Sequence, residues 1–327
     1  MPKNPFLFVV GCARSGTTLL QRMLDSHPQL AVSNDPHFIP FAVQGVLDGV
    51  DPPVTPELVD SVLDYRTFIR LGLPEAAVRE AAAGAERYSD FVGAIYSAFA
   101  RMRGKPLGGE KTPRYVRYLP LLASLFPWAK IVHIIRDGRD VALSMLDWAR
   151  PDRGPGRFQL WQDRPVAVCA LSWRWHVTTG RRDGIRLGRD RYHEVRYEDL
   201  VAKPEEALRR IAHFLELDFA PEMLRYHEGK ERSDPGLSTK GRWLPPTLGL
   251  RDWRVQMAPG EVELYEAIAG DVLTLFGYES AFDSISEATE SLARLCRESW
   301  EADLHRREKR MASRLELRIE LPSYPAA

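Results

Sequence analysis

Residues able to bind a phosphate group lie close to the start of this chain. Gly11 and Gly16 are separated by four residues, which is the glycine spacing of a phosphate-binding P-loop. An apolar run at residues 6–10 precedes them, and the apolar pattern of a helix follows. Backbone N–H groups at a helix N-terminus carry partial positive charge and bind anions. The order of strand, loop and helix therefore predicts a site for a phosphate-bearing ligand.

The position of the positive charge distinguishes this loop from that of an ordinary ATPase. The residue after Gly16 is Thr17, where nucleotide triphosphatases have a lysine. The charge lies earlier, at Arg14, and is flanked by Ser15 and followed by Thr18. A glycine-rich turn that only joins a strand to a helix would not need these basic and hydroxyl side chains. We therefore expect a phosphate-bearing donor rather than ATP hydrolysis.

Three further segments carry polar residues where a strand pattern ends: 110–113 (Glu-Lys-Thr-Pro), 136–145 (beginning Arg-Asp-Gly-Arg-Asp) and 195–205. Together with residues 11–18, these segments closely resemble the sulfotransferases that use 3′-phosphoadenylyl sulfate (PAPS). The similarity is greatest to the bacterial and tyrosylprotein-type branch. It extends over residues 6–278, although residues 41–109 carry little of it. The four segments in this order together make a strong case for the resemblance, whereas any one of them alone would not.

Apolar runs at residues 6–10 and 130–135, together with a third short segment at 192–196, predict strands that alternate with helices. This alternation predicts an α/β fold with a parallel sheet and helices on both faces, and the resemblance implies a P-loop-like central sheet. We expect helices at 17–26, over most of 55–103, and at 115–126, 166–182, 204–215 and 260–276. A further new helix is expected directly after residues 136–140. Residues 31–40 are expected to be a polar connection and 104–109 a break in the chain. The predicted units are an α/β domain at 1–284 and a helical extension at 285–327.

The composition restricts the class of protein. The chain has 327 residues, 44% of them hydrophobic and 28% charged, with a formal net charge of zero. This fits a soluble globular protein and gives no overall basic character for nucleic-acid binding. Three scattered cysteines, Cys12, Cys169 and Cys296, predict a reducing cytoplasm. Neither a signal peptide nor a bilayer-spanning apolar stretch is recognisable.

The extension at 285–327 has an apolar stripe, formed by Leu292, Leu295, Leu304, Met311 and Leu315. Its distal half is basic. We favour a solvated helix that packs on the domain through this stripe. A homodimer contact, or a basic surface for an anionic acceptor or a membrane, are the alternatives.

The resemblance implies roles for residues at the donor site. Arg14, Ser15, Gly16, Thr17 and Thr18 would hold the 5′-phosphosulfate of PAPS through backbone N–H groups, hydroxyls and one guanidinium.

Arg136 and Ser144 match the site of the 3′-phosphate. Arg136 lies where a buried strand ends and Ser144 two helical turns later, so both could converge on a dianionic phosphate. Taken alone, Arg136 would more readily form an ion pair with Asp137 or Asp140. Arg139 and Asp140 are expected to be structural.

Four more residues are carried over from the family. Tyr197 matches a position near the 3′-phosphate, although packing would also explain it. Trp173 matches an aromatic residue that often lies against the adenine, and core packing is an equal explanation. Lys240 and Arg242 lie in a polar loop similar to the family's late lid over the 3′-phosphate.

The resemblance also implies catalytic residues. Lys111 matches a lysine near the oxygen that bridges sulfate and phosphate, where it would stabilise charge on the leaving group. The alternative is an ion pair with Glu110. Asp35 aligns with the general-base glutamate of the tyrosylprotein branch, and His37 aligns with an arginine of that branch. We rank Asp35 as the first candidate for the general base and His37 as a near second. The alternative is that Asp35 is structural and only shapes the turn before Pro36.

The expected reaction moves a sulfuryl group from PAPS to a hydroxyl, or to an amine, and releases 3′,5′-ADP (PAP). No metal is required, and no metal-binding cluster is recognisable. A P-loop kinase or nucleotidase that uses ATP and Mg²⁺ is the second hypothesis, and a degenerate nucleotide-binding protein is the third. The acceptor could be a small molecule, a glycan, a lipid or a peptide. Aromatic residues in variable segments suggest a partly apolar acceptor site, namely Phe38, Phe41, Trp148, Phe158 and Trp161.

Overall fold

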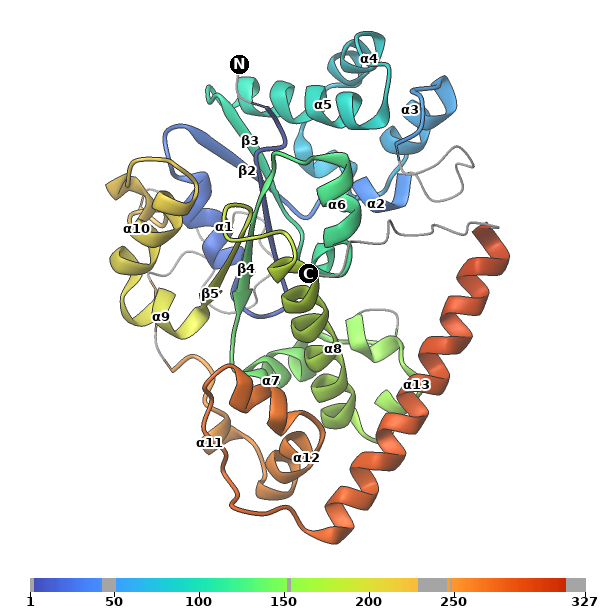
Figure 1. The fold of residues 1–327 in the computed structure, drawn as a ribbon, viewed down its shortest axis with the longest axis vertical. Helices are drawn as coiled ribbons and strands as arrows, with labels where there is room; N and C mark the ends of the chain where they lie inside the picture. Colours follow the sequence, from blue (N-terminus) through green and yellow to red (C-terminus); the bar gives the residue numbers. More distant parts are fainter. Residues whose placement is uncertain (1–2, 43–50, 152–153, 229–245, 248, 316–327) are drawn as a thin grey trace.

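A central sheet of five parallel strands organises the fold, with the strand order β2-β3-β1-β4-β5 (Figure 1). The computed structural model describes residues 3–42, 51–151, 154–228, 246–247 and 249–315. The strands are β1 (Leu7–Gly11), β2 (Leu30–Asn34), β3 (Leu107–Lys111), β4 (Lys130–Ile135) and β5 (Tyr192–Arg196). Because all five are parallel, the residues that follow them gather at one edge of the sheet.

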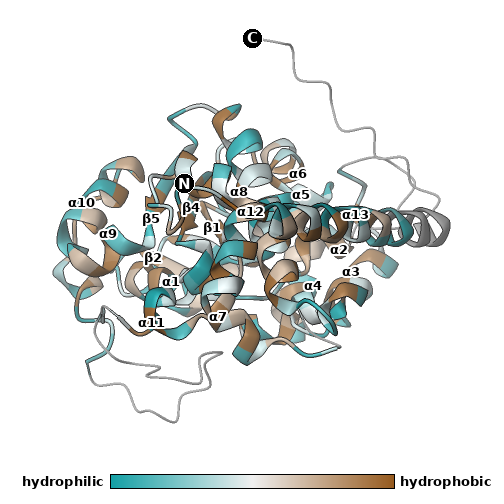
Figure 2. Cartoon of the chain, turned by 90° about the horizontal axis from the view of Figure 1, so that it is seen from below, coloured by the Kyte–Doolittle hydropathy of each residue, from teal (hydrophilic) through white to brown (hydrophobic). Residues whose placement is uncertain are grey.

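Helices cover both faces of the sheet, as the sequence predicts. Leu7 and Val9 of β1 point to one face and pack with α1 (Thr17–Asp25) and α10 (Pro204–Phe214). Phe8 and Val10 point to the other face and pack with α5 (Tyr88–Met102) and α6 (Leu119–Leu125), among other helices. Strands buried on both faces explain the continuous apolar runs in the sequence. Figure 2 shows these hydrophobic strands inside more polar outer helices.

A third apolar cluster lies beyond the carboxyl ends of the strands. It joins α7 (Gly138–Trp148), α8 (Pro165–Ile185), α12 (Pro259–Leu275) and α13 (Glu287–Leu315) to Cys12 and Ile135. The other α-helices are α2 (Ile39–Ala42), α3 (Pro56–Leu63), α4 (Glu75–Ala83), α9 (Tyr197–Ala202) and α11 (Trp253–Gln256). Short 3₁₀ helices are η1 (Phe68–Leu71), η2 (Pro113–Arg117), η3 (Gly154–Arg157), η4 (Gln159–Trp161) and η5 (Pro221–Met223).

Two strands were not predicted, because their sequences do not have the usual strand composition. β2 occupies part of the expected connection at 31–40, and β3 overlaps the expected break at 104–109. β3 contains Gly108 and Gly109 because its neighbours are very close. A Cβ atom at Gly108 would lie 2.4 Å from the Tyr96 carbonyl oxygen, and one at Gly109 would lie 2.8 Å from the Leu7 carbonyl oxygen. Here glycine indicates close packing of α5 and β1 on a central strand.

The predicted helix at 115–126 is two elements. η2 ends at Arg117 and α6 begins at Leu119, with Pro120 in its first turn. Proline lacks the N–H that would continue a helix from η2, and it suits the first turn of a new one. The other predicted helices are present within a few residues of their expected bounds.

The C-terminal helix packs on α8 and α12, but only partly through the predicted stripe. Ala293, Cys296 and Trp300 are buried, whereas Leu295 is 59% exposed. Leu292 and Leu304 are partly buried against the same cluster, while the side chains of residues 308–315 lie outside the described part. The Trp300 ring stacks on Phe158 at 3.8 Å and meets Trp175 edge-on at 6.1 Å. The separate unit at 285–327 remains a prediction.

Trp300→Ala is expected to lower the free energy of unfolding by roughly 3 kcal/mol, because it removes a buried aromatic ring and leaves a cavity. The measurement is urea unfolding followed by circular dichroism. Leu295→Ala on the same helix is the control, and its exposed side chain should change stability by less than about 0.5 kcal/mol. Equal effects of the two substitutions would mean that α13 does not pack through Trp300.

Candidate active site

The phosphate-binding loop at residues 11–18 joins β1 to α1 in a tightly packed turn. Gly16 has φ +89°, and a Cβ atom there would lie 2.3 Å from the ring of Tyr197. Arg14 also has a positive φ, of 75°. The Ser15 side chain is fully buried, and its hydroxyl has no hydrogen-bond partner among the described residues. Since buried hydroxyls usually have a partner, an oxyanion bound in the loop would suit this one.

Arginines from three separate segments converge beside this loop. The Arg14 Nε donates a hydrogen bond to Ser144 Oγ at 3.0 Å. Burial lowers the pKa of Arg14, and the positive charges of Arg251 and Arg136 lower it further. Arg251 also forms an ion pair with Asp147. The structure therefore joins the residues assigned to the 5′-phosphosulfate and the 3′-phosphate in one cationic cluster. Arg251 was not predicted, although it lies just after the polar loop that contains the expected basic lid.

Arg136 is nearly buried at the end of β4. Its guanidinium lies 4.3 Å from the centre of the Tyr197 ring and 3.0 Å from Asp140 Oδ2, while Nε is buried without a hydrogen-bond partner. Arg136 therefore forms the ion pair with Asp140 that the sequence offered as the alternative. Among the described residues, its Nε still has no hydrogen-bond acceptor. Tyr197 lies between Arg136 and Gly16 and so packs against both parts of the candidate donor site.

Arg139 is structural, as the sequence indicates. It is fully buried and forms ion pairs with Asp137 at 2.8 Å and Glu266 at 2.6 Å. Asp137 also accepts a hydrogen bond from the backbone N–H of Arg139 as the N-cap of α7, and another from Trp253 Nε1. This network fixes the start of α7, the helix that carries Ser144.

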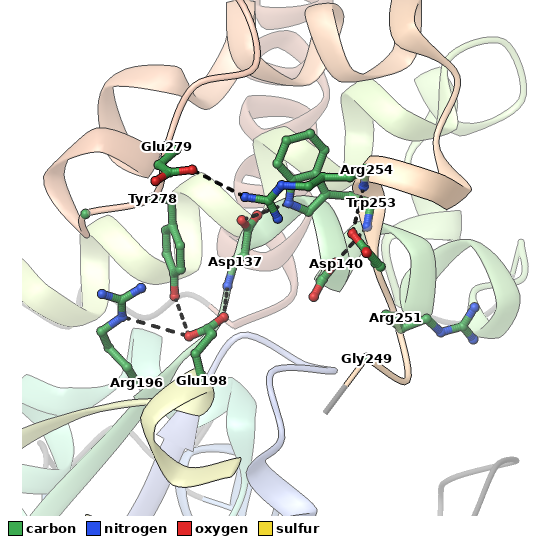
Figure 3. Close-up of a pocket in the computed structure, with 12 residues that line it drawn as sticks. Asp137, Asp140, Arg196, Glu198, Gly249, Arg251, Trp253, Arg254, Tyr278 and Glu279 are labelled. Atoms are coloured by element: carbon green, nitrogen blue, oxygen red, sulfur yellow. Dashed lines mark hydrogen bonds and ion pairs between the residues drawn. The ribbon is translucent and has the colours of Figure 1, made fainter. Parts of the chain in front are cut away.

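A polar pocket of about 400 Å³ adjoins this network (Figure 3). Glu198 accepts hydrogen bonds from the Asp137 backbone N–H at 2.9 Å and the Tyr278 hydroxyl at 3.1 Å. In Figure 3, Arg196 and Tyr278 point toward Glu198 from one side, and Trp253 points toward Asp137. The lining of this pocket includes Asp140 and Arg251 but neither residues 11–18 nor Lys111.

Trp173 lies in the core rather than at a surface that could hold adenine. Its side chain is fully buried, and its Nε1 donates to the Arg136 carbonyl oxygen at 3.1 Å. The packing alternative thus describes its position, and the residue fixes the backbone that carries Arg136. Lys240 and Arg242 lie outside the described residues. Among the aromatic residues suggested for the acceptor site, Phe38 is also fully buried.

Lys111 and Asp35 form a buried ion pair at the carboxyl edge of the sheet. Their Nζ and Oδ2 atoms are 2.6 Å apart, and the side chains are only 1% and 5% exposed. Asn34 of β2 is the register partner of Lys111 in β3, so the next residue, Asp35, falls beside it. The Lys111 ammonium also lies 3.5 Å from the hydroxyl of Thr18. The alternative pairing with Glu110 is not formed, because Glu110 accepts from Tyr96 and Thr112 instead.

His37 completes a chain of three ionisable groups. Its Nε2 lies 3.5 Å from Asp35 Oδ1, and its side chain is 26% exposed. Burial raises the pKa of Asp35, but the charge of Lys111 and hydrogen bonds from His37 and Lys111 outweigh burial and lower it to about 2. Asp35 is therefore ionised at neutral pH, with one oxygen toward Lys111 and the other toward His37.

The backbone around this carboxylate is strained. Asp35 and His37 have φ angles of 57° and 62°, in a region that residues other than glycine rarely adopt. Arg70 donates to the Asp35 carbonyl oxygen at 2.9 Å, and Thr67 donates to the Pro36 carbonyl oxygen at 2.7 Å. Such strain is common at functional sites and persists when the surroundings hold it. The supporting residues have no recognisable signal in the sequence.

These features define a P-loop-like α/β protein with a cluster of arginines beside the loop at residues 11–18. The model described as "Sulfotransferase family" matches residues 5–221, and the chain belongs to this family. It is 25% identical to a protein-tyrosine sulfotransferase of Drosophila melanogaster over 84% of this chain and 52% of that protein. It therefore spans about half the length of that relative.

Two other similar proteins are a nodulation protein and a domain of a synthase. The nodulation protein NoeE of Sinorhizobium fredii is 27% identical over 86% of this chain and 68% of that protein. The solved sulfotransferase domain of the olefin synthase from Synechococcus PCC 7002 is 26% identical, with a TM-score of 0.58 over 84% of this chain and 95% of that domain. The likeness confirms the predicted P-loop-like fold.

No helix in the part of the chain that the structure describes is long and apolar enough to cross a membrane. No group of three or more His, Cys, Asp or Glu side chains within the described ranges could hold a metal ion.

Proposed function

We propose that this protein transfers a sulfuryl group from PAPS to a hydroxyl group and releases PAP. The observation that carries this proposal is the convergence of Arg14, Arg136 and Arg251 beside the phosphate-binding loop. Arg136 and Arg251 are each paired with a carboxylate, that of Asp140 and that of Asp147. Burial and the charges of these two arginines still lower the pKa of Arg14, and a ligand with several phosphate charges would stabilise the cluster. The unpartnered buried donors at Ser15 and Arg136 suit the same ligand.

Lys111 is proposed to stabilise the leaving group. The acceptor oxygen forms a bond to sulfur while the bond between sulfur and the bridging phosphate oxygen breaks, and the electron pair remains on PAP. Lys111 lies within reach of Thr18 in the phosphate-binding loop, so its ammonium can face the charge that develops there. Asp35 holds this ammonium in position.

His37 and Asp35 are proposed to share the removal of the acceptor proton. Alignment with the family places Asp35 first, but its carboxylate is buried and already paired with Lys111. His37 is the more exposed of the two and lies against the other carboxylate oxygen. We therefore propose that His37 takes the proton and that Asp35 stabilises the resulting imidazolium.

His37→Ala is expected to lower kcat about 100-fold or more, with the affinity for PAP unchanged, because a general base contributes about that much. If Asp35 alone were the base, His37→Ala would keep most of the wild-type kcat. Steady-state measurement of kcat, with the PAP affinity measured by calorimetry, separates the two assignments.

One experiment tests the proposed sulfuryl transfer against the kinase or nucleotidase alternative. The protein is incubated with PAPS and a panel of phenols, alcohols, sugars and peptides, and sulfated products are detected by mass spectrometry with parallel release of PAP. A parallel reaction with ATP and Mg²⁺ tests the kinase or nucleotidase hypothesis. Transfer from ATP but not from PAPS would overturn the proposal. The homodimer through the C-terminal helix and the cytoplasmic location remain predictions.

A further inference from the structure

A surface of alternating aromatic and basic side chains begins directly after Lys111. η2 carries Arg114 and Arg117. Arg114 lies 5.1 Å from the centre of the Phe41 ring, and Arg117 lies 4.2 Å from the Trp175 ring and 5.8 Å from the Tyr118 ring. Phe41 stacks on a further ring, that of Tyr65, at 6.0 Å and meets Tyr118 edge-on at 5.8 Å. The side chains thus form one continuous surface, which we call the aromatic–arginine surface.

The two arginines of this surface have no acidic partner. Neither forms an ion pair with any described residue, and the Nε of Arg117 is buried without a hydrogen-bond partner. Burial and the charge of Arg114 lower the pKa of Arg117 to about 10. The nearby Glu110 cannot compensate, because it is buried and accepts hydrogen bonds from Tyr96 and Thr112. A cation held in this way suits a ligand that supplies the negative charge.

The surface adjoins the residues proposed to react. η2 packs against β1 and α8, and the ring of Tyr115, in the same short helix, lies 6.4 Å from the ring of His37. The charge of Arg117 also reaches Cys12, at the start of the phosphate-binding loop. Tyr115 itself is fully buried, but Phe41 of the surface lies in α2, which begins two residues after His37. The surface is therefore close to the residue proposed to take the acceptor proton.

We propose that the acceptor carries an anionic group as well as its reacting hydroxyl, and that Arg117, assisted by Arg114, binds that group. A carboxylate, phosphate or sulfate would accept paired hydrogen bonds from a guanidinium. The apolar part of the acceptor would lie on Phe41, Tyr65 and Tyr118. This inference rests on the proposed function, and it narrows the acceptor to anionic molecules with an aromatic or apolar part.

Trp175 is the rigid support of this subsite. It lies under the Arg117 guanidinium and is itself packed edge-on by Trp300 of α13. Stacking on Trp175 restricts the arginine side chain before any ligand binds, which reduces the entropy lost on binding. Methionine at position 117 would keep an unbranched apolar chain on the indole ring and remove only the charge and its donors.

The test compares two phenols that differ in one charge, 4-hydroxyphenylacetate and 4-hydroxyphenylacetamide. Calorimetric titration into the PAP-loaded protein is expected to give an affinity about 10-fold higher for the carboxylate, as one charged hydrogen-bonding pair would provide. In Arg117→Met this preference should fall to less than about 2-fold, with the affinity for the amide unchanged. Arg101→Met is the matched control, because Arg101 is exposed at the end of α5 that precedes β3, at the opposite edge of the sheet.

The outcomes separate this inference from the proposed function. A wild-type protein that binds PAP but binds the carboxylate no better than the amide, or does not measurably bind the carboxylate, overturns the anionic-acceptor assignment alone. Loss of the preference in Arg101→Met as well would also overturn it. Failure to bind PAP would instead overturn the proposed function. Unchanged PAP affinity in Arg117→Met confirms that the variant is folded.

Discussion

Lys111→Met is expected to lower kcat by about 100- to 1,000-fold, because it removes the charge proposed to stabilise the leaving phosphate. The affinity for PAP should change much less, since the arginine cluster and the phosphate-binding loop remain. Single-turnover measurements with PAPS and an acceptor identified by the product screen would give kcat, and calorimetry would give the PAP affinity. Retained kcat in Lys111→Met would exclude the lysine from the chemical step.

The same substitution is also expected to cost stability. Lys111→Met leaves Asp35 as a buried carboxylate without its partner, which costs roughly 3–5 kcal/mol. Burial would then raise the folded-state pKa of Asp35 above its unfolded value of about 3.9. The folded state would bind more protons than the unfolded state, so the stability loss should shrink as the pH falls from 7 toward 4.

A double variant separates the structural effect from the chemical one. Lys111→Met combined with Asp35→Asn removes both charges, so most of the lost stability should return at pH 7. Activity should not return, because the leaving-group charge is still unopposed. Recovery of activity together with stability would show that Lys111 serves only the fold.

Arg136→Ala is expected to weaken binding of 3′,5′-ADP by about 10- to 100-fold, the effect of losing hydrogen bonds to a charged group. Binding of 5′-AMP, which lacks the 3′-phosphate, should weaken by less than about 3-fold. The two ligands differ only at the 3′ position, so 5′-AMP is an internal control for damage to the loop or to Tyr197. Calorimetric titration of both ligands measures the difference.

Equal losses for the two nucleotides would remove Arg136 from the 3′-phosphate site. The residue would then be a structural partner of Asp140, which already lies 3.0 Å away. The assignment of Ser144 to the 3′-phosphate site can be tested with the same two nucleotides. Ser144 accepts a hydrogen bond from Arg14, which ties it to the same cluster. Ser144→Ala should also weaken 3′,5′-ADP more than 5′-AMP, though by less than Arg136→Ala, because it removes an uncharged group.

The parts of the fold with strong local patterns could be predicted. β1 and β4 have apolar runs because they are buried on both faces, whereas only Tyr192 and Val195 of β5 are buried. The predicted helices have marked boundaries. β2 and β3 could not be found in the same way. β3 is recognisable only when Gly108 and Gly109 are understood as places where α5 and β1 come too close for a side chain. That closeness depends on the tertiary structure.

Residues of the candidate site that lie at the ends of recognisable strands could be predicted. Contacts that depend on the register between two paired strands could not. Residues 11–18 and Arg136 lie at the ends of β1 and β4 and could be located in this way, whereas Lys111, the last residue of β3, was located only through the resemblance to the family. The ion pair between Lys111 and Asp35 depends on the pairing of β2 with β3, and neither strand was predicted. Arg251 comes from a distant segment without a local pattern. Trp173 matched an aromatic residue that lies against the adenine in the family, but its side chain is fully buried in the structure.

Calorimetric titration of the wild-type protein with 3′,5′-ADP, and separately with ATP and Mg²⁺, tests the central claim most directly. The account predicts tight binding of 3′,5′-ADP and little or no binding of ATP, because the arginine cluster is proposed to bind a nucleotide with phosphate at both the 3′ and 5′ positions. A preference for ATP with Mg²⁺ would contradict the sulfotransferase assignment of this site, and binding of neither nucleotide would favour a non-catalytic protein.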